Sequence, residues 1–432
     1  MYLLLRFVNQ RSENDESQAI TSQEVQVNMN NRTDGITQTL EEIPQPGIFF
    51  RFLGLHTLLY GIFPFYIPVY MWTQGVTLSG ISWFIAVSGA GFMLGLWTWD
   101  RLRGRISLVS MFALSLVLEL FLLVVILILK GSGTMMIVTT GFAYGFYNCF
   151  YWTTQRAMFY SLINLHNSGR KYGNLQIFVG ALLQVGIVIG GYILDMYTYH
   201  HMLIISALIS VVGLLLLVPS RPEYPKALTE QPRLSIPEVL KFKDQNKSRL
   251  MFVTDATFLF AESFFWIITL FMLVHESFFN LGIVVLSLAV AFGFVFYVLK
   301  NVIDRISTRR LFQIAVVLYA LSWWLRSYIN EPMSLASLYL MMIVITFLTA
   351  FFRLTLNKRF YDIAQHDLGN AYLILKSYFT QVATLVIFAL IAWFFMLAGD
   401  QVELLKYTYW SLAVCTFLYL PYERRIRSHS SG

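Results

Sequence analysis

Charged residues are scarce in this sequence: 13% of its 432 residues are Asp, Glu, Lys or Arg, against about 25% in an ordinary soluble domain. Cysteine is scarcer still. Cys149 and Cys415 both lie in apolar stretches, without the spacing of a zinc site or a redox pair, so we expect two free thiols. These shortages exclude a typical soluble protein and a disulfide scaffold.

Patterns for nucleic-acid binding and for catalysis are also missing. The net charge is +7, but the basic residues lie in short loops between apolar runs and form no separate basic domain, so we expect no nucleic-acid partner. The sequence has neither a His-Glu-x-x-His pair nor a nucleophile and base in a known catalytic motif. It therefore predicts a protein that is not an enzyme and that uses no cofactor and no metal ion.

Apolar residues are abundant instead, at 57% of the chain, and they gather into runs of about twenty. Such a run, for example 106–129, is long enough to cross the roughly 30 Å hydrocarbon core of a bilayer as a helix. The sequence thus predicts an all-α membrane protein that spans a lipid bilayer many times. We place twelve spans at about 52–74, 76–99, 106–129, 134–160, 172–197, 201–219, 250–274, 279–302, 311–329, 333–357, 370–398 and 404–422.

A polar connector divides the spans into six plus six. It contains four prolines and seven Lys or Arg residues, and it is the only long loop between spans. We expect two pseudo-symmetric six-helix bundles around a central cavity, in a protein that acts as a monomer. The predicted parts are a disordered tail (1–50), the first bundle (51–220), the connector (221–249), the second bundle (250–423) and a short tail (424–432).

Lys and Arg are distributed unevenly between the two sides of this topology. One side, with both tails and the connector, holds 26 of the 31, and the other holds three. The remaining two, Arg353 and Lys376, fall inside spans. Because basic residues stay on the cytoplasmic side, we predict a multi-pass protein of the cell membrane with both termini in the cytoplasm.

The two halves repeat the same loop chemistry. Residues 100–105 follow the second span as Asp-Arg-Leu-Arg-Gly-Arg, and residues 304–310 follow the eighth as Asp-Arg-Ile-Ser-Thr-Arg-Arg. A second matched pair, with Phe, Tyr, His, Gly and Tyr at similar spacing, lies in residues 159–172 and 360–372. Two matched pairs at corresponding places indicate a duplicated six-helix unit.

At these residues the chain resembles the major facilitator superfamily of secondary transporters, which carries an acidic-Arg-x-Gly-Arg loop after its second and eighth spans. The resemblance covers nearly everything after the tail and implies alternating access, as a symporter or an antiporter. In the family these loops brace helix ends in one conformation, although here Arg103 is inserted before Gly104 and the second copy lacks its glycine. Simple membrane anchoring is the alternative role. The implied gating residues are Asp100, Arg101, Arg105, Asp304, Arg305 and Arg309.

Glu262 is the first candidate for a proton-binding or cation-binding group. It lies about twelve residues, or ~18 Å, into the seventh span, close to mid-membrane. Asp255, Glu262, Trp266 and Thr269 share one helical face, which we expect to line a polar cavity, as the seventh span does in the resembled family. The alternative is a protonated Glu262 that is hydrogen-bonded within the bundle.

Two other ionisable residues bear on this choice. Arg353 in the tenth span lies at the depth of Asp255 and about 9 Å from that of Glu262, so we expect Arg353 to pair with Asp255 and to leave Glu262 without a cation. Glu119, near the centre of the third span, is the second candidate for proton coupling, although the third span is peripheral in the resembled family.

Polar aromatic residues mark further candidates. In the fourth span Tyr144, Tyr147, Asn148 and Tyr151 form a stripe of hydroxyl and amide groups that suits an organic solute, or alternatively packs between helices. His56 in the first span lies before two prolines that loosen the helix. It is a candidate proton carrier, and a structural role is the alternative.

These features predict a secondary active transporter that moves a small organic molecule by alternating access, coupled to protons. Fold alone does not decide function, so a receptor or assembly protein that keeps the fold without transport is the alternative.

Overall fold

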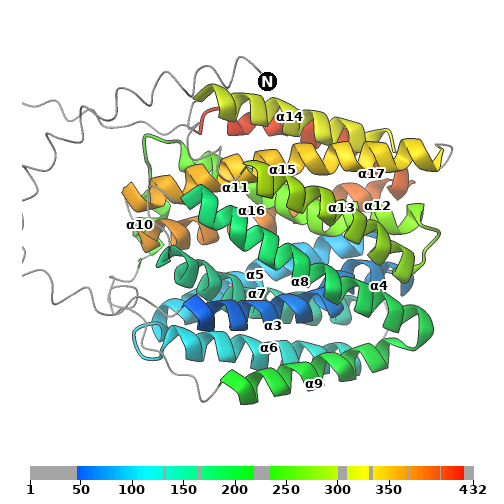
Figure 1. The fold of residues 1–432 in the computed structure, drawn as a ribbon, viewed down its shortest axis with the longest axis horizontal. Helices are drawn as coiled ribbons and strands as arrows, with labels where there is room; N and C mark the ends of the chain where they lie inside the picture. Colours follow the sequence, from blue (N-terminus) through cyan, green and yellow to red (C-terminus); the bar gives the residue numbers. More distant parts are fainter. Residues whose placement is uncertain are drawn as a thin grey trace, which may run out of the picture. The chain divides into compact units, whose positions relative to one another are not determined.

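A computed structural model describes residues 46–129, 133–162, 168–217, 234, 236–299, 309–329, 334–366, 369–398 and 400–422. Asp304, Arg305, about half of the connector, most of the first predicted tail and all of the second lie outside these ranges. In the described residues every regular element is a helix, and the long helices run side by side with short connections at their ends (Figure 1).

The first six predicted spans all correspond to helices. Two prolines, Pro64 and Pro68, interrupt the first span, as expected, with a 3-10 turn. The elements are α3 (Pro46–Ile62), η3 (Pro64–Tyr66) and α4 (Ile67–Thr73), which form the first span, and then α5 (Leu78–Leu102), α6 (Leu108–Ile128), α7 (Thr134–Tyr160), α8 (Ser168–Met196) and α9 (Tyr199–Leu217).

The other six spans are also helical. A π-helical turn interrupts the seventh at its centre, and the turn contains Glu262. The elements are the short α10 (Ile236–Lys241) in the connector, α11 (Ser248–Phe260), the π-turn η5 (Ala261–Phe265) and α12 (Trp266–Leu273), which form the seventh span, and then α13 (Phe278–Leu299), α14 (Arg309–Ser327), α15 (Leu335–His366), α16 (Asn370–Leu397), and α17 (Gln401–Cys415) with η6 (Thr416–Tyr419).

Helix α15 extends beyond the predicted end of the tenth span. Hydropathy ends this span at residue 357, before Lys358 and Arg359, but α15 continues to His366. Lys358 pairs with Asp362 one turn later at 2.7 Å, and the ring of Phe360 packs on that of Tyr372 in α16. These contacts stabilise helical turns that are too polar to count as a membrane span.

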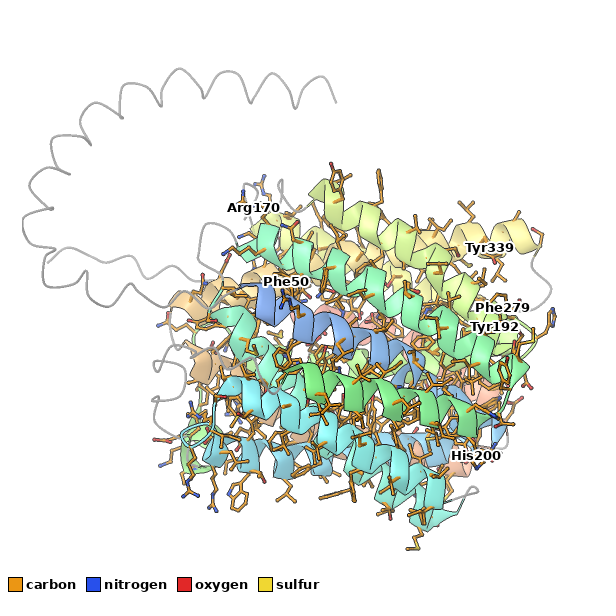
Figure 2. The ribbon with its side chains drawn as sticks, turned by 60° about the horizontal axis from the view of Figure 1, so that its bottom comes forward. Phe50, Arg170, Tyr192, His200, Phe279 and Tyr339 are labelled. Atoms are coloured by element: carbon orange, nitrogen blue, oxygen red, sulfur yellow. The ribbon has the colours of Figure 1, made fainter. Side chains whose placement is uncertain are left out.

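In the part of the chain that the structure describes, seven helical spans are long and apolar enough, by length and composition, to cross a membrane. Other predicted spans, such as α7, are less apolar because they carry polar side chains that are buried inside the protein. The outer surface of the helices carries large apolar side chains, among them Phe121, Leu215 and Phe294, each more than half exposed. Figure 2 shows many side chains projecting outward from the helices. Their exposure fits a surface covered by lipid.

The two halves meet through α5 against α16 and through α8 against α13. Glycine allows the second contact, because a Cβ atom at Gly191 of α8 would lie 2.6 Å from the carbonyl oxygen of Phe278. Asp195, near the end of α8, accepts hydrogen bonds from the backbone N–H groups of Phe278 and Phe279 at the start of α13. Tyr192 and Phe279 lie together at this end (Figure 2).

The halves also touch at the other end of the helices. The ring of Phe159 in α7 lies 5.3 Å from that of Tyr361 in α15, centre to centre. Arg156 donates a hydrogen bond to Ser377 of α16 at 3.3 Å. The two bundles therefore contact each other at both ends of the helices.

Cysteine labelling tests the predicted orientation. Gln74 and Gly104 lie at opposite ends of α5 and are both exposed. In a variant without Cys149 and Cys415, we expect a membrane-impermeant maleimide to label Gln74→Cys in intact cells and Gly104→Cys only after permeabilisation. The reverse pattern would overturn the orientation.

Candidate solute-binding cavity and buried charges

A cavity of about 180 Å³ lies between the two halves. Both bundles contribute to it, as alternating access requires, and aromatic rings form much of its wall. The lining residues are Tyr60, Ser88, Phe92, Tyr144, Gly145, Asn148, Trp152 and Arg156 from the first half, and Leu259, Phe260, Ser263, Phe264 and Gln381 from the second.

One face of α7 supplies most of the polar groups. Tyr144, Asn148, Trp152 and Arg156 recur every fourth residue, which places them on one side of a helix. The hydroxyls of Tyr144 and Tyr60 lie 3.2 Å apart, and Trp152 donates to the side-chain oxygen of Asn148 at 3.0 Å. The stripe gives the cavity hydroxyl and amide groups in fixed positions.

Arg156 brings a positive charge to the cavity. Its hydrogen bond to Ser377 is to a neutral group, and within the described residues no carboxylate lies within ion-pairing distance of it. Sequence counting assigned Arg156 to the basic loops, because it lies near the end of its span. Extending the Tyr144 to Trp152 spacing by one more turn would have found it.

The predicted stripe on α7 divides into two faces. Tyr144 and Asn148 line the cavity, but Tyr147 and Tyr151 turn toward His56 of α3 inside the first bundle. A helix turns by about 100° per residue, so neighbours such as Tyr147 and Asn148 point in quite different directions. Only one half of the predicted stripe therefore meets the space between the bundles.

The second half contains a buried cluster of charges centred on Arg353. Its guanidinium lies 2.6 Å from Asp255 and 2.8 Å from Glu262. Lys376 of α16 approaches the other oxygen of Asp255 at 2.8 Å. Tyr319 of α14 donates a hydrogen bond to Glu262 at 2.7 Å. Two carboxylates thus face two cations, and the cluster is balanced in charge.

The expected pair between Asp255 and Arg353 is therefore present, but the expectation that Glu262 lacks a cation was wrong. Asp255 and Glu262 lie two turns apart on one helical face, and the forked guanidinium of Arg353 is long enough to bridge them. The face they share points into the second bundle, and the cavity described above is lined by Leu259, Ser263 and their neighbours instead.

Trp266 and Thr269 follow the same face into the second bundle. Thr269 hydrogen-bonds to Tyr409 of α17 at 2.7 Å. Arg326, which sequence counting placed in an outer loop, is only 3% exposed and lies over the rings of Trp266 and Trp323. In the described residues it has no carboxylate partner, so the second half carries more buried positive than negative charge.

The first loop motif pairs differently from the resembled pattern. Asp100 accepts a hydrogen bond from Arg103 at 2.6 Å, and both side chains are buried. Arg101 lies over the ring of Trp97, and Arg105 is exposed. Arg103, the residue inserted relative to the family's loop pattern, is thus the ion-pair partner of Asp100. The side chain of Arg309, like all of Asp304 and Arg305, lies outside the described residues.

His56 and Glu119 lie together inside the first bundle, with His56 Nε2 3.9 Å from a carboxylate oxygen of Glu119. Both side chains are fully buried. Each residue is a candidate from the sequence on its own, but hydropathy and helical spacing do not predict that the two side chains meet.

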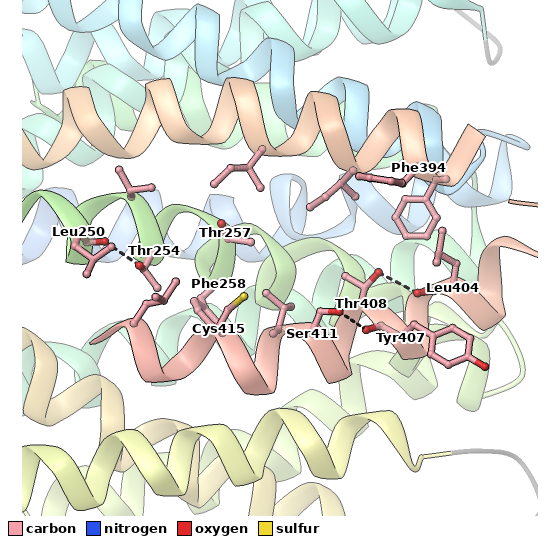
Figure 3. Close-up of a pocket in the computed structure, with 16 residues that line it drawn as sticks. Leu250, Thr254, Thr257, Phe258, Phe394, Leu404, Tyr407, Thr408, Ser411 and Cys415 are labelled. Carbon is pink, nitrogen blue, oxygen red and sulfur yellow. Dashed lines mark hydrogen bonds between the residues drawn. The ribbon is translucent and has the colours of Figure 1, made fainter. Parts of the chain in front are cut away.

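A second cavity, of about 430 Å³, lies between α11, α16 and α17 (Figure 3). Apolar side chains such as Leu250, Phe258 and Phe394 form most of its wall. The hydroxyls of Thr254, Thr408 and Ser411 donate to carbonyl oxygens of their own helices. This cavity offers a solute few free polar groups, unlike the cavity between the bundles.

Comparison with known proteins gives consistent results. A family model described as the Major Facilitator Superfamily matches residues 49–374. The structure of the nucleoside transporter NupG aligns with a TM-score of 0.62 and 12% identity, over 88% of this chain and 99% of that chain. That of the human organic anion transporter MFSD10 (TETRAN) aligns with a TM-score of 0.60 and 14% identity, over 88% and 100%. No curated protein matches the sequence significantly.

Proposed function

This chain belongs to the major facilitator superfamily, and on that basis we propose that it is a secondary active transporter that moves a small organic anion across the cell membrane by alternating access, coupled to protons. Family and fold support the coarser statement that it is a multi-pass membrane transporter. The solute class and the coupling are our own proposals.

The observation that carries the solute class is the unbalanced charge of Arg156. A guanidinium without a carboxylate partner at the wall of a cavity offers an anion both a counter-charge and several hydrogen-bond donors. The rings of Trp152, Tyr144 and Phe264 offer flat apolar surface beside it. A compact anion with a planar or aromatic body satisfies both features.

The two structural neighbours suggest different solutes. NupG is a nucleoside transporter, and MFSD10 is an organic anion transporter. A neutral nucleoside would use the amide and hydroxyl groups of Asn148, Gln381 and Tyr144, but it would leave Arg156 without a counter-charge. The cavity therefore favours an organic anion.

Thermal-shift measurements on the purified protein test the solute class. The ligands are matched pairs, each an aromatic carboxylate and its own neutral amide. A ligand that binds only the folded state stabilises it and so raises the melting temperature. At a ligand concentration one hundred times the Kd, the added free energy of unfolding is about 2.7 kcal/mol. We expect the carboxylates to stabilise the protein and the amides to do so much less. Equal or greater stabilisation by the amides would refute an anionic solute.

Flux in proteoliposomes then tests transport itself. The best carboxylate from the binding screen should enter protein-containing vesicles faster than empty ones, and an imposed pH gradient should concentrate it. Binding without any flux would favour the receptor alternative and would overturn the proposed function.

A further inference from the structure

We infer that the coupling proton is carried by the buried pair of Glu119 and His56 in the first bundle, rather than by Glu262. This inference rests on the proposed proton-coupled transport and names the site that performs it.

The carboxyl group of Glu119 is the least satisfied polar group in this bundle. Its exposure is 0%, and neither oxygen has a hydrogen-bond partner in the described structure. An ionised carboxylate in such a place, with no donor and no permanent cation, is far too costly to persist. Glu119 must therefore hold a proton or share one with His56, its neighbour at 3.9 Å.

His56 is placed to share that proton. Its Nε2 atom lies 2.9 Å from the hydroxyl of Tyr147, and its ring stacks on that of Tyr151 with 3.5 Å between ring centres. The pair can then exist as neutral acid with neutral imidazole or as carboxylate with imidazolium, and both forms bind one proton and have zero net charge.

No other charged group compensates the pair within the described residues. The ionisable side chains that contact His56 are the tyrosines Tyr147 and Tyr151 of α7. Tyr60 of α3 and Tyr144 of α7 line the cavity instead. The charged and histidine side chains of α5, α8 and α9, which pack around α3, α6 and α7, lie near their helix ends. Loss of the proton therefore leaves one buried negative charge, so release requires water to reach the site.

Helix α7 connects this pair to the solute cavity. One face carries Tyr144, Trp152 and Arg156 at the cavity, and the adjacent face carries Tyr147 and Tyr151 against His56. A shift of α7 that follows an anion on Arg156 also moves the hydroxyl of Tyr147 at the proton site. Occupancy of the two sites is thereby linked through one rigid element.

Glu262 is in the opposite situation. Arg353 and Tyr319 satisfy its two oxygens, and the cluster around it is balanced in charge when both carboxylates are ionised. A proton added to Glu262 would break an existing ion pair, so this carboxylate suits a fixed charge better than a carrier.

The test compares Glu119→Gln with Glu262→Gln in proteoliposomes. Glutamine has the shape of the protonated acid but does not titrate. We expect Glu119→Gln to keep exchange of solute at equal concentrations and to lose accumulation driven by a pH gradient, which for one proton per solute reaches about tenfold for each pH unit. Ser115→Ala, one turn earlier on α6 and equally buried, is the control and should keep both activities.

Full gradient-driven accumulation in Glu119→Gln, or its loss in Glu262→Gln alone, would overturn the assignment. A second measurement does not depend on transport. Infrared difference spectra of the wild-type protein between acid and alkaline pH should contain a band of a protonated carboxyl group in an apolar site, and this band should vanish in Glu119→Gln. A band that persists there refutes the site, whereas a wild-type protein that has the band but no flux refutes the proposed function instead.

Discussion

Replacing Arg156 with Gln should weaken the binding of an anionic solute about tenfold to a hundredfold and should reduce its transport accordingly. A hydrogen bond to a charged group contributes roughly 1.5–3 kcal/mol, and glutamine keeps a donor but loses the charge. Titration of the best carboxylate and of its neutral amide measures the effect. We expect a large loss for the carboxylate and little change for the amide.

Two variants make this experiment specific. Arg156→Lys keeps the charge but not the forked geometry and should retain part of the affinity. Arg310→Gln removes an equal charge from an exposed position at the start of α14, so it should bind like the wild type. Equal weakening of the carboxylate and the amide by Arg156→Gln would mean that Arg156 shapes the cavity and does not recognise charge.

The helices of this protein could be predicted from the sequence because hydrophobicity is a property of whole segments. Each predicted span coincides with a helix or with two helices in line. The predicted spans differ from the helices mainly at their ends, as in α15, which continues beyond Lys358 to His366. There the helix is stabilised by an ion pair and by ring contacts between elements, which a count of apolar residues along one segment does not detect.

The direction of each polar face could not be predicted in the same way. The polar face of α11 and η5 is real, but it points at Arg353 and Tyr319 inside the second bundle. The fourth span has polar groups on two faces, toward the cavity and toward His56. Helical spacing tells which residues share a face, but only the packing of neighbouring helices decides what that face meets.

Pairing between distant residues was partly predictable. Equal depth in the membrane correctly matched Asp255 with Arg353, because helices that cross the bilayer bring groups of equal depth together. Depth alone missed the bridge from Arg353 to Glu262, since the long side chain of Arg353 contacts two carboxylates that lie two helical turns apart. Depth also missed the contact between His56 and Glu119. The sequence does not show that α3 and α6 turn these two side chains toward each other inside the first bundle.

Asp255 should be the most costly of the buried charges to remove. It is 1% exposed, and it accepts from Arg353 at 2.6 Å, from Lys376 at 2.8 Å and from Tyr419 at 3.1 Å. Asp255→Asn leaves two buried cations to share the single charge of Glu262. Breaking a buried ion pair in this way costs on the order of 3–5 kcal/mol, so we expect a marked fall in the melting temperature and in the yield of folded protein.

A double variant separates the loss of charge balance from the loss of packing. Lys376→Gln removes one of the stranded cations, so Asp255→Asn combined with Lys376→Gln should be more stable than Asp255→Asn alone. Asp195→Asn, at an exposed position where asparagine can still accept hydrogen bonds from the backbone, is the comparison and should cost about 1 kcal/mol or less. If the stability lost in the double variant equals the sum of the losses in Asp255→Asn and Lys376→Gln, the two residues are not coupled. The balance of charge would then not be what holds α11 and α16 together.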